Sequence, residues 1–341
     1  MTCAALSVHQ MIPEAKQSAV ARALDKAFGV REFDEIRLLT GGLSTALVFR
    51  IVVRSHPYLL RLTMPGAPSG DPAGQFACLQ TAAEAGIAPH IWYVNMQDGV
   101  LIADFVEARP FPADMGVRIA PILHQVHSLR GFRKPKVGSY FDAMDRFVNA
   151  FRAANLLPPD DTDELFRRYA DLMKVYPRDD SQLVASHNDV KPQNILFDGE
   201  RLWLVDWEAG FLNDRYVDLS IAANFFVHDD QEAAYLDAYF GATATPYQHA
   251  RFYLMRQALH VFYATMLMVT TARSGAPIDS EATVPDFRDF HRRLISGEVS
   301  LTTAEEKVQY ARVHLDAADR QVRTPRFEDA LALVASVAPG S

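Results

Sequence analysis

The chain has 341 residues, 49% of them hydrophobic, which is enough to bury a large core and to form two lobes. Its formal net charge of −8 argues against a nucleic-acid groove, because a phosphate backbone requires a basic surface. Two cysteines, Cys3 and Cys78, cannot form a disulfide framework and fit a reducing cytoplasm. No apolar run approaches the ~20 residues that span a bilayer, and residues 1–13 show no signal-peptide pattern. We therefore expect a cytoplasmic protein that binds neither nucleic acid nor a membrane.

The first third of the chain combines short strand-like runs with helices. An amphipathic pattern over residues 13–29 predicts a helix that ends at Gly29, and a second helix is expected at 75–85. Between and after these helices, apolar runs rich in β-branched residues predict strands at 36–39, 46–53, 58–63, 90–95 and 100–104. We expect a small β-rich lobe over residues 1–107, with a lobe boundary near Ala108 to Pro112.

The remainder, residues 108–341, predicts a larger and mainly helical lobe. Its helical pattern is interrupted at 183–206, where polar residues are followed by two short apolar runs. Asp198-Gly199-Glu200 lies between these runs and predicts the turn of a hairpin. The expected fold class is therefore α+β, with a small β-rich N-terminal lobe and a larger helical C-terminal lobe.

The most informative stretch runs from His187 to Asn194 and continues to Asp206. Asp189 is followed five residues later by Asn194, and Asp206 comes at the end of the second strand of the hairpin. Phosphoryl transfer needs a carboxylate near the attacking hydroxyl, and an amide and a second carboxylate can hold Mg²⁺ against nucleotide phosphates. A capped turn before an ordinary hairpin is the alternative, but three such residues at this spacing are hard to obtain by chance.

This stretch resembles the aminoglycoside phosphotransferase and choline kinase superfamily, whose members are relatives of the protein kinases. The resemblance extends over about residues 36–225, and it implies a two-lobed protein-kinase-like fold. It rests on several further runs: Leu39–Thr45, Gly86–Pro89, Asp98–Glu107, Leu123–Leu129, Asp206–Glu208 and Asp218–Ser220. A protein kinase is disfavoured because Asn188 stands where the catalytic-loop arginine is usual, and because few residues separate Asp206 from Asp218.

The resemblance implies roles for the residues of the catalytic loop. Asp189 would be the catalytic base or would orient the acceptor hydroxyl, and Asn194 and Asp206 would bind Mg²⁺. Lys191 either neutralises charge on the transferred phosphoryl group or is a solvated loop lysine. His187 and Asp218 would support the loop without touching substrate.

The resemblance also implies a nucleotide site in the first lobe. Gly41 and Gly42 would let backbone N–H groups approach the phosphates of ATP, and Ser44 and Thr45 would add hydroxyl donors. Arg61 would bind phosphate, supported by Gln75 or Glu84, and the sequence leaves both open. The adenine would be read through the hinge, which comprises Asp104, Phe105 and Val106.

An acceptor site follows from the likeness to choline and ethanolamine kinases. Glu208 with Phe225 and Tyr253 could surround a small cation, together with Phe226, Phe262 and Tyr263, although these aromatics also fit a helical core. The predicted function is ATP- and Mg²⁺-dependent phosphorylation of a hydroxyl on a small cationic amino alcohol, by a monomer or a homodimer. An aminoglycoside or thiamine kinase remains open, as does a catalytically silent binding module with the same fold.

Overall fold

A computed structural model describes residues 11–39, 46–64, 71–278 and 283–337. The chain divides into two compact units: residues 1–111 with 193–210, and residues 112–192 with 211–341. The hairpin at 193–210 thus packs with the first unit, although in sequence it follows residues 187–192, the proposed catalytic loop. The lobe limits expected from the sequence, 1–107 and 108–341, remain a prediction.

The first unit is built on a five-stranded antiparallel sheet in the order β1-β2-β3-β5-β4. Its strands are β1 (Glu35–Leu38), β2 (Leu47–Val53), β3 (His56–Leu62), β4 (Ile91–Asn95) and β5 (Val100–Asp104). Helix α1 (Glu14–Phe28) precedes the sheet and ends at Gly29, which has a left-handed backbone with φ 68°. Helix α2 (Pro72–Glu84) connects β3 to β4. The helices and strands predicted for this region are confirmed, with shifts of a few residues at their ends.

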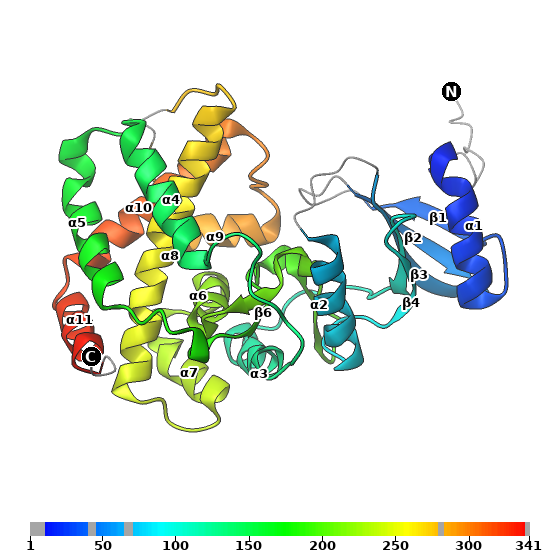
Figure 1. The fold of residues 1–341 in the computed structure, drawn as a ribbon, viewed down its shortest axis with the longest axis horizontal. Helices are drawn as coiled ribbons and strands as arrows, with labels where there is room; N and C mark the ends of the chain where they lie inside the picture. Colours follow the sequence, from blue (N-terminus) through cyan, green and yellow to red (C-terminus); the bar gives the residue numbers. More distant parts are fainter. Residues whose placement is uncertain (1–10, 40–45, 65–70, 279–282, 338–341) are drawn as a thin grey trace. The chain divides into compact units, whose positions relative to one another are not determined.

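The core of this unit lies between α1 and one face of the sheet. Ala23 and Leu24 of α1 are fully buried there, together with Leu60 and Leu62 of β3. Because side chains alternate along a strand, Arg61 points to the opposite face of the sheet. Figure 1 shows α1 and α2 on opposite sides of the sheet. Arg61 therefore lies on the face that α1 leaves uncovered.

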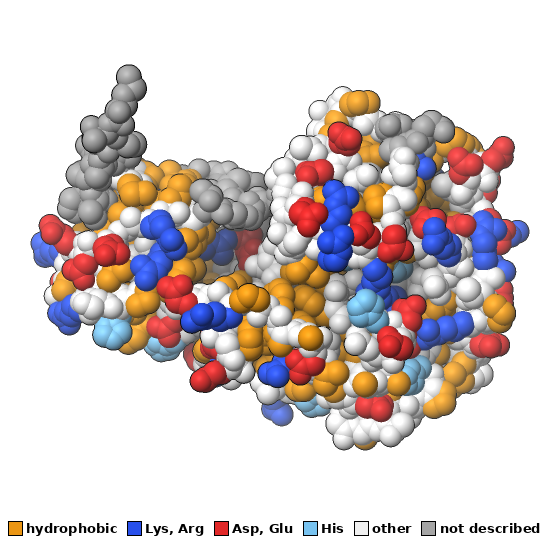
Figure 2. All heavy atoms as spheres, turned by 180° about the vertical axis from the view of Figure 1, so that it is seen from behind, with side chains coloured by type: hydrophobic (Ala, Val, Ile, Leu, Met, Phe, Trp, Pro, Cys, Tyr) orange, Lys and Arg blue, Asp and Glu red, His pale blue; other side chains and the backbone are white. Residues whose placement is uncertain are grey.

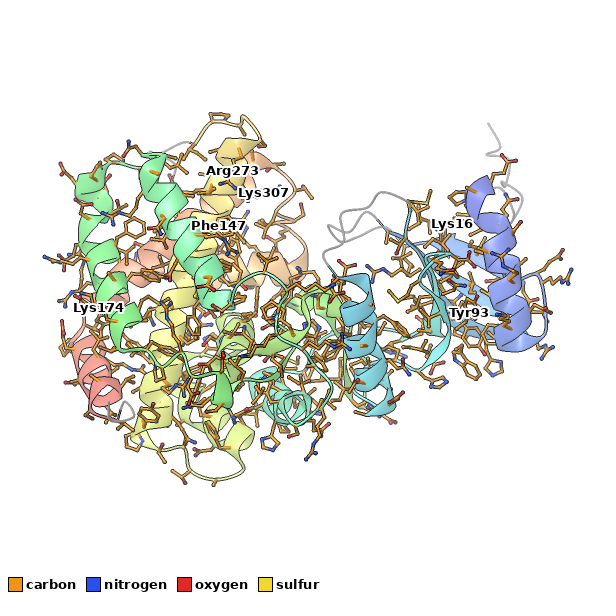
Figure 3. The ribbon with its side chains drawn as sticks, in the orientation of Figure 1. Lys16, Tyr93, Phe147, Lys174, Arg273 and Lys307 are labelled. Carbon is orange, nitrogen blue, oxygen red and sulfur yellow. The ribbon has the colours of Figure 1, made fainter. Side chains whose placement is uncertain are left out.

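The turn between β4 and β5 is tied to α1. Lys16 of α1 is buried, and its ammonium group donates a hydrogen bond to the carbonyl of Asp98, while Arg22 forms an ion pair with the Asp98 carboxylate. Figure 3 labels Lys16 on α1. These contacts fix the helix along the sheet, since one residue of the turn accepts from two successive turns of α1.

The hairpin at 193–210 completes the first unit. Strands β7 (Ile195–Phe197) and β8 (Leu202–Leu204) pair in antiparallel fashion around the predicted turn, in which Gly199 has φ 108°. The amide of Leu204 donates to the carbonyl of Ile87, at 2.9 Å, so the hairpin is joined to the loop after α2. A short 3₁₀ turn, η4 (Trp207–Ala209), follows Asp206.

The second unit is a helical bundle around the long helix α8 (Pro246–Arg273). Figure 1 shows α8, in yellow, running through the middle of this bundle. Its other helices are α3 (Met115–His127), α4 (Tyr140–Ala153), α5 (Pro159–Val175), α6 (Arg215–Phe226), α7 (Glu232–Phe240), α9 (Phe287–Ser296), α10 (Ala304–Val322) and α11 (Pro325–Val337). A two-stranded ribbon, β6 (Val184–Ser186) paired with β9 (Phe211–Asn213), lies at the base of the catalytic loop.

The fold class predicted from the sequence is confirmed, with an antiparallel sheet in the first unit and helices in the second. On the face drawn in Figure 2, Lys and Arg side chains are interspersed with Asp and Glu side chains. Within the part of the chain that the structure describes, no helix has both the length and the apolar character needed to cross a bilayer.

Candidate active site

The catalytic loop is held by a buried carboxylate of α6. Asp218 is fully buried, and its two oxygens accept hydrogen bonds from the backbone amides of His187, at 2.8 Å, and Asn188, at 2.6 Å. The ring of His127 contacts the same carboxylate at 3.2 Å, and its other nitrogen lies 2.7 Å from the hydroxyl of Tyr239. Asp218 thereby fixes where the loop leaves β6.

Asn188 gives the loop its sharp change of direction. Its φ of 64° is left-handed, a conformation that Asn tolerates better than most residues. Its side chain is buried, and its carbonyl oxygen accepts a 2.7 Å hydrogen bond from the amide of Asn213 on β9. Asn188 therefore joins the loop to the ribbon beneath it.

Replacing Asn188 by Ala should lower the free energy of unfolding by about 2–4 kcal/mol. Alanine is strained in a left-handed backbone, and the buried partners of the Asn188 side chain would lose their hydrogen bonds. The matched control is Asn155→Ala, since Asn155 is also left-handed, with φ 47°, but is exposed. Thermal unfolding should show a clearly larger loss for Asn188→Ala, and Asn188→Gly should lie between wild type and Asn188→Ala. Equal losses for both Ala variants would show that the buried hydrogen bonds of Asn188 contribute nothing.

Asp189 is accessible and sits beside a cation of its own loop. The ammonium of Lys191 lies 2.6 Å from the Asp189 carboxylate, and the two side chains are 35% and 32% exposed. The backbone amide of Asp189 donates to Nδ1 of the fully buried His187, at 3.3 Å. The Asp189 carboxylate is thus partly exposed and paired with Lys191, while the ring of His187 accepts from the backbone of the loop.

Three tyrosines on separate helices interact electrostatically with Asp189. Burial raises the pKa of Tyr140 on α4, of Tyr263 on α8 and of Tyr310 on α10, and the negative charge of Asp189 raises the pKa of each further. Tyr140 also packs against Phe262, with ring centroids 5.3 Å apart. The sequence did not indicate Tyr140 or Tyr310, because only the packing of helices far apart in the chain brings them to the loop.

Two other predicted acceptor residues have different surroundings. The hydroxyl of Tyr253 is hydrogen-bonded to Gln321 and Thr324, and the guanidinium of Arg326 lies 4.2 Å from its ring centroid. Tyr253 is ten residues from Tyr263 on α8, or about 15 Å along the helix. Phe225 packs against His291, at 4.9 Å between ring centroids. Roles for Phe225 and Tyr253 in acceptor binding stay predictions, and these contacts favour their reading as core.

The two proposed magnesium ligands lie at the same end of the hairpin. Asn194 directly precedes β7, Asp206 follows β8, and the amide of Val205 donates to the carbonyl of Asn194 at 2.9 Å. Asp206 has a left-handed backbone with φ 62°. Mg²⁺ prefers oxygen ligands and is usually held by one or two carboxylates, phosphates and water. The residues present fit that preference, whereas no group of three or more His, Cys, Asp or Glu side chains among the described residues could hold a metal alone.

Arg61 is paired with the turn that carries Asp206. Its guanidinium forms an ion pair with Glu208, and its Nη1 lies 3.9 Å from Oδ1 of Asp206. Both carboxylates come from the hairpin segment, whereas the sequence left open a partner on α2. Glu84 accepts instead from Gln80 of the same helix, at 2.9 Å.

The remaining nucleotide-site predictions are placed as follows. Gly41, Gly42, Ser44 and Thr45 lie outside the described residues. The side chain of Asp104, at the end of β5, accepts from the indole of Trp92 at 2.7 Å, and its amide donates to the carbonyl of His90. Phe105 and Val106 follow β5 and have no regular secondary structure, so their backbone groups take part in no strand pairing. Adenine recognition by this segment stays a prediction.

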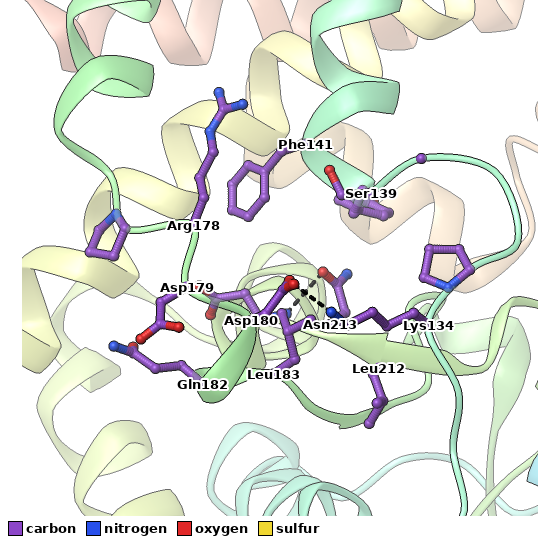
Figure 4. Close-up of a pocket in the computed structure, with 15 residues that line it drawn as sticks. Lys134, Ser139, Phe141, Arg178, Asp179, Asp180, Gln182, Leu183, Leu212 and Asn213 are labelled. Carbon is purple, nitrogen blue, oxygen red and sulfur yellow. Dashed lines mark hydrogen bonds and ion pairs between the residues drawn. The ribbon is translucent and has the colours of Figure 1, made fainter.

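A cavity of about 360 Å³ opens on the ribbon behind the loop. Figure 4 shows it between the start of α4 and β9, with the Lys134–Asp180 ion pair at its floor. Asp189 does not line it. Asn213 does line it, and Asn213 is hydrogen-bonded to Asn188. The cavity therefore adjoins the residues that hold the loop in place, and not Asp189 itself.

Comparison with solved structures shows the same fold in several kinases. A choline/ethanolamine kinase family protein from Mesorhizobium loti matches at 21% identity and TM-score 0.68, covering 94% of this chain and 99% of its own. An ethanolamine kinase of Plasmodium vivax matches at 17% identity and TM-score 0.57, covering 87% and 83%. A spectinomycin phosphotransferase in complex with ADP and spectinomycin matches at 13% identity and TM-score 0.52, covering 87% and 98%. These identities are low, so the likeness shows the fold.

No curated protein sequence matches the chain. A family model does, over residues 35–253, which include the sheet, the catalytic loop, the hairpin and the first part of α8. The match covers well over half of the chain and contains Asp189, Asn194 and Asp206. The chain therefore belongs to the phosphotransferase enzyme family.

Proposed function

We propose that this phosphotransferase uses ATP and Mg²⁺ to phosphorylate a hydroxyl group of a small cationic amino alcohol. The observation that carries the proposal is a partly exposed Asp189 carboxylate on a loop that Asp218 holds in place. The charge of this carboxylate raises the pKa of Tyr140, Tyr263 and Tyr310. A carboxylate suits the hydroxyl that attacks, and aromatic rings suit the ammonium group of such an alcohol.

The chain's own groups divide the work. Asp189 accepts a hydrogen bond from the acceptor hydroxyl, orients it and takes its proton as the hydroxyl oxygen bonds to the γ-phosphorus and the bond from that phosphorus to ADP breaks. Lys191, which lies beside Asp189, can move to the transferred phosphoryl group and offset its charge. Asn194 and Asp206 would hold Mg²⁺, which when bound neutralises negative charge on the nucleotide phosphates. Arg61 would bind the same phosphates through its guanidinium.

The surroundings of Asp189 favour a small cation over an aminoglycoside. Among the described residues, those that interact electrostatically with Asp189 include the aromatic side chains of Tyr140, Tyr263 and Tyr310. A polycationic aminoglycoside would need several carboxylates, whereas a single ammonium group gains about 1 kcal/mol from each aromatic face. Aminoglycoside and thiamine phosphorylation are the competing functions. A cytoplasmic location and a monomeric or homodimeric state are part of the proposal.

A coupled ADP-release assay should show turnover with choline or ethanolamine and far less with thiamine, spectinomycin or other aminoglycosides. Tyr263→Leu should raise the KM of the preferred acceptor several-fold, since aromatic faces are lost while the apolar volume is retained. Phe166→Leu, a buried aromatic of α5 that packs against Phe151, is the matched control. Turnover with aminoglycosides alone would overturn the amino-alcohol assignment and leave the kinase assignment standing.

A further inference from the structure

Arg61 occupies the centre of the first unit's sheet. It lies on the middle strand β3, opposite Val48 of β2 and Leu101 of β5 in the antiparallel register. Both neighbours along β3, Leu60 and Leu62, are fully buried on the α1 side. The guanidinium is therefore anchored by a rigid strand, and its direction depends on the carboxylate that it meets on the other face.

Helix α2 does not provide that carboxylate among the described residues. Gln75 is neutral, and Glu84 is hydrogen-bonded to Gln80 one turn earlier in the helix. The helix packs instead on the turn that follows Asp206. The thiol of Cys78 contacts the carbonyl of Gly210 at 3.4 Å, and a Cβ atom at Gly210 would lie only 3.0 Å from that of Cys78. Close packing with α2 thus fixes the turn that presents Glu208.

We propose that Glu208 is the positioning counter-ion of Arg61 and belongs to the nucleotide site, in place of a glutamate on the helix. The proposal rests on the proposed function. Because Glu208 follows Asp206 by two residues, one short turn carries both the proposed metal ligand and the group that orients the phosphate-binding cation. Its negative charge also offsets repulsion between Arg61 and a cation held at Asp206.

This role differs from the binding of a cationic acceptor by Glu208, and kinetics separates the two. Glu208→Gln keeps the shape and removes the charge. The Kd for Mg²⁺–ADP should rise roughly fivefold, the upper end for a partly exposed pair, while the KM of the acceptor should change less than about twofold. Glu200→Gln, an exposed glutamate at the hairpin turn, is the matched control and should leave both constants unchanged.

A double-mutant cycle tests whether Glu208 acts through Arg61. In the Arg61→Ala background, Glu208→Gln should have no further effect on Mg²⁺–ADP affinity measured by calorimetry, because its partner is already absent. Glu208→Asp, which keeps the charge at shorter reach, should recover part of the affinity. Additive losses in the double mutant, or a shift confined to acceptor KM, would overturn the proposal.

The calorimetric cycle needs no turnover, so its result is independent of the acceptor. If the wild-type chain binds Mg²⁺–ADP but phosphorylates no amino alcohol, the proposed function is wrong. The double-mutant cycle would still test whether Glu208 supports Arg61 in nucleotide binding. A wild-type chain that binds no nucleotide would overturn both. Equal thermal unfolding midpoints for the variants and wild type would exclude misfolding as the cause of weaker binding.

Discussion

Asp189→Asn should reduce turnover by about 10²-fold or more while nucleotide affinity and stability stay close to those of wild type. The two side chains have nearly the same shape, but the amide cannot accept the proton of the acceptor hydroxyl. The loop itself should persist, because its backbone is held by Asp218 rather than by the carboxylate of Asp189. Steady-state kinetics with the preferred acceptor, together with calorimetry of Mg²⁺–ADP, measures both halves of this expectation.

The matched control is Asp171→Asn. Asp171 also pairs with a nearby lysine, Lys174, at 3.1 Å on the surface of α5, where Figure 3 labels the lysine. Removing its carboxylate should leave turnover unchanged, since an exposed ion pair contributes little. If Asp189→Asn retains more than about a tenth of wild-type turnover, Asp189 is not the base, and the loss of its pairing with Lys191 becomes the measured effect.

Much of the fold could be predicted because local patterns and tertiary packing agree. The hairpin at 193–210 combines two apolar runs with a glycine turn, and the structure places β7 and β8 on those runs. The end of α1 at Gly29 is equally local, since a left-handed residue terminates a helix wherever it occurs. The phosphotransferase motif was readable for the same reason, because Asp189 and Asn194 lie on one short loop.

The surroundings of the site could not be predicted because they depend on residues distant in sequence. Tyr140 on α4 and Tyr310 on α10 belong to no sequence motif. The charge of Asp189 nevertheless raises the pKa of both side chains. Tyr253 belongs to the same helix as Tyr263 but lies ten residues before it. Its hydroxyl is hydrogen-bonded to Gln321 and Thr324. The aromatic residues of the sequence therefore did not indicate which rings lie near the loop that carries Asp189.

The partner of Arg61 shows a second limit of sequence reasoning. The resemblance to kinases implies that Arg61 is supported by Gln75 or Glu84, which both lie on the helix after β3. The structure pairs Arg61 with Glu208, 147 residues later. A side chain's ionic partner follows from which elements pack on the exposed face of a strand, and spacing along the chain does not encode that packing.

Asp206→Asn should weaken Mg²⁺-dependent nucleotide binding by at least about tenfold, because removal of a direct ligand should cost at least as much as removal of a group that merely supports one. Asn is the informative replacement. Asp206 has a left-handed backbone with φ 62°, which Asn tolerates and Ala does not, so Asp206→Ala would add backbone strain to the loss of charge.

The measurement is calorimetry of ADP with Mg²⁺ and, in parallel, with the metal chelated. In chelator the variant should bind ADP at least as well as wild type, since a carboxylate that repels phosphate has been removed. With Mg²⁺ present the order should reverse. Equal affinities in Mg²⁺ would remove Asp206 from the metal site, and a loss that is the same with and without metal would point to the Arg61–Asp206–Glu208 arrangement instead. The difference between the two conditions isolates the metal ligand from the neighbouring charges.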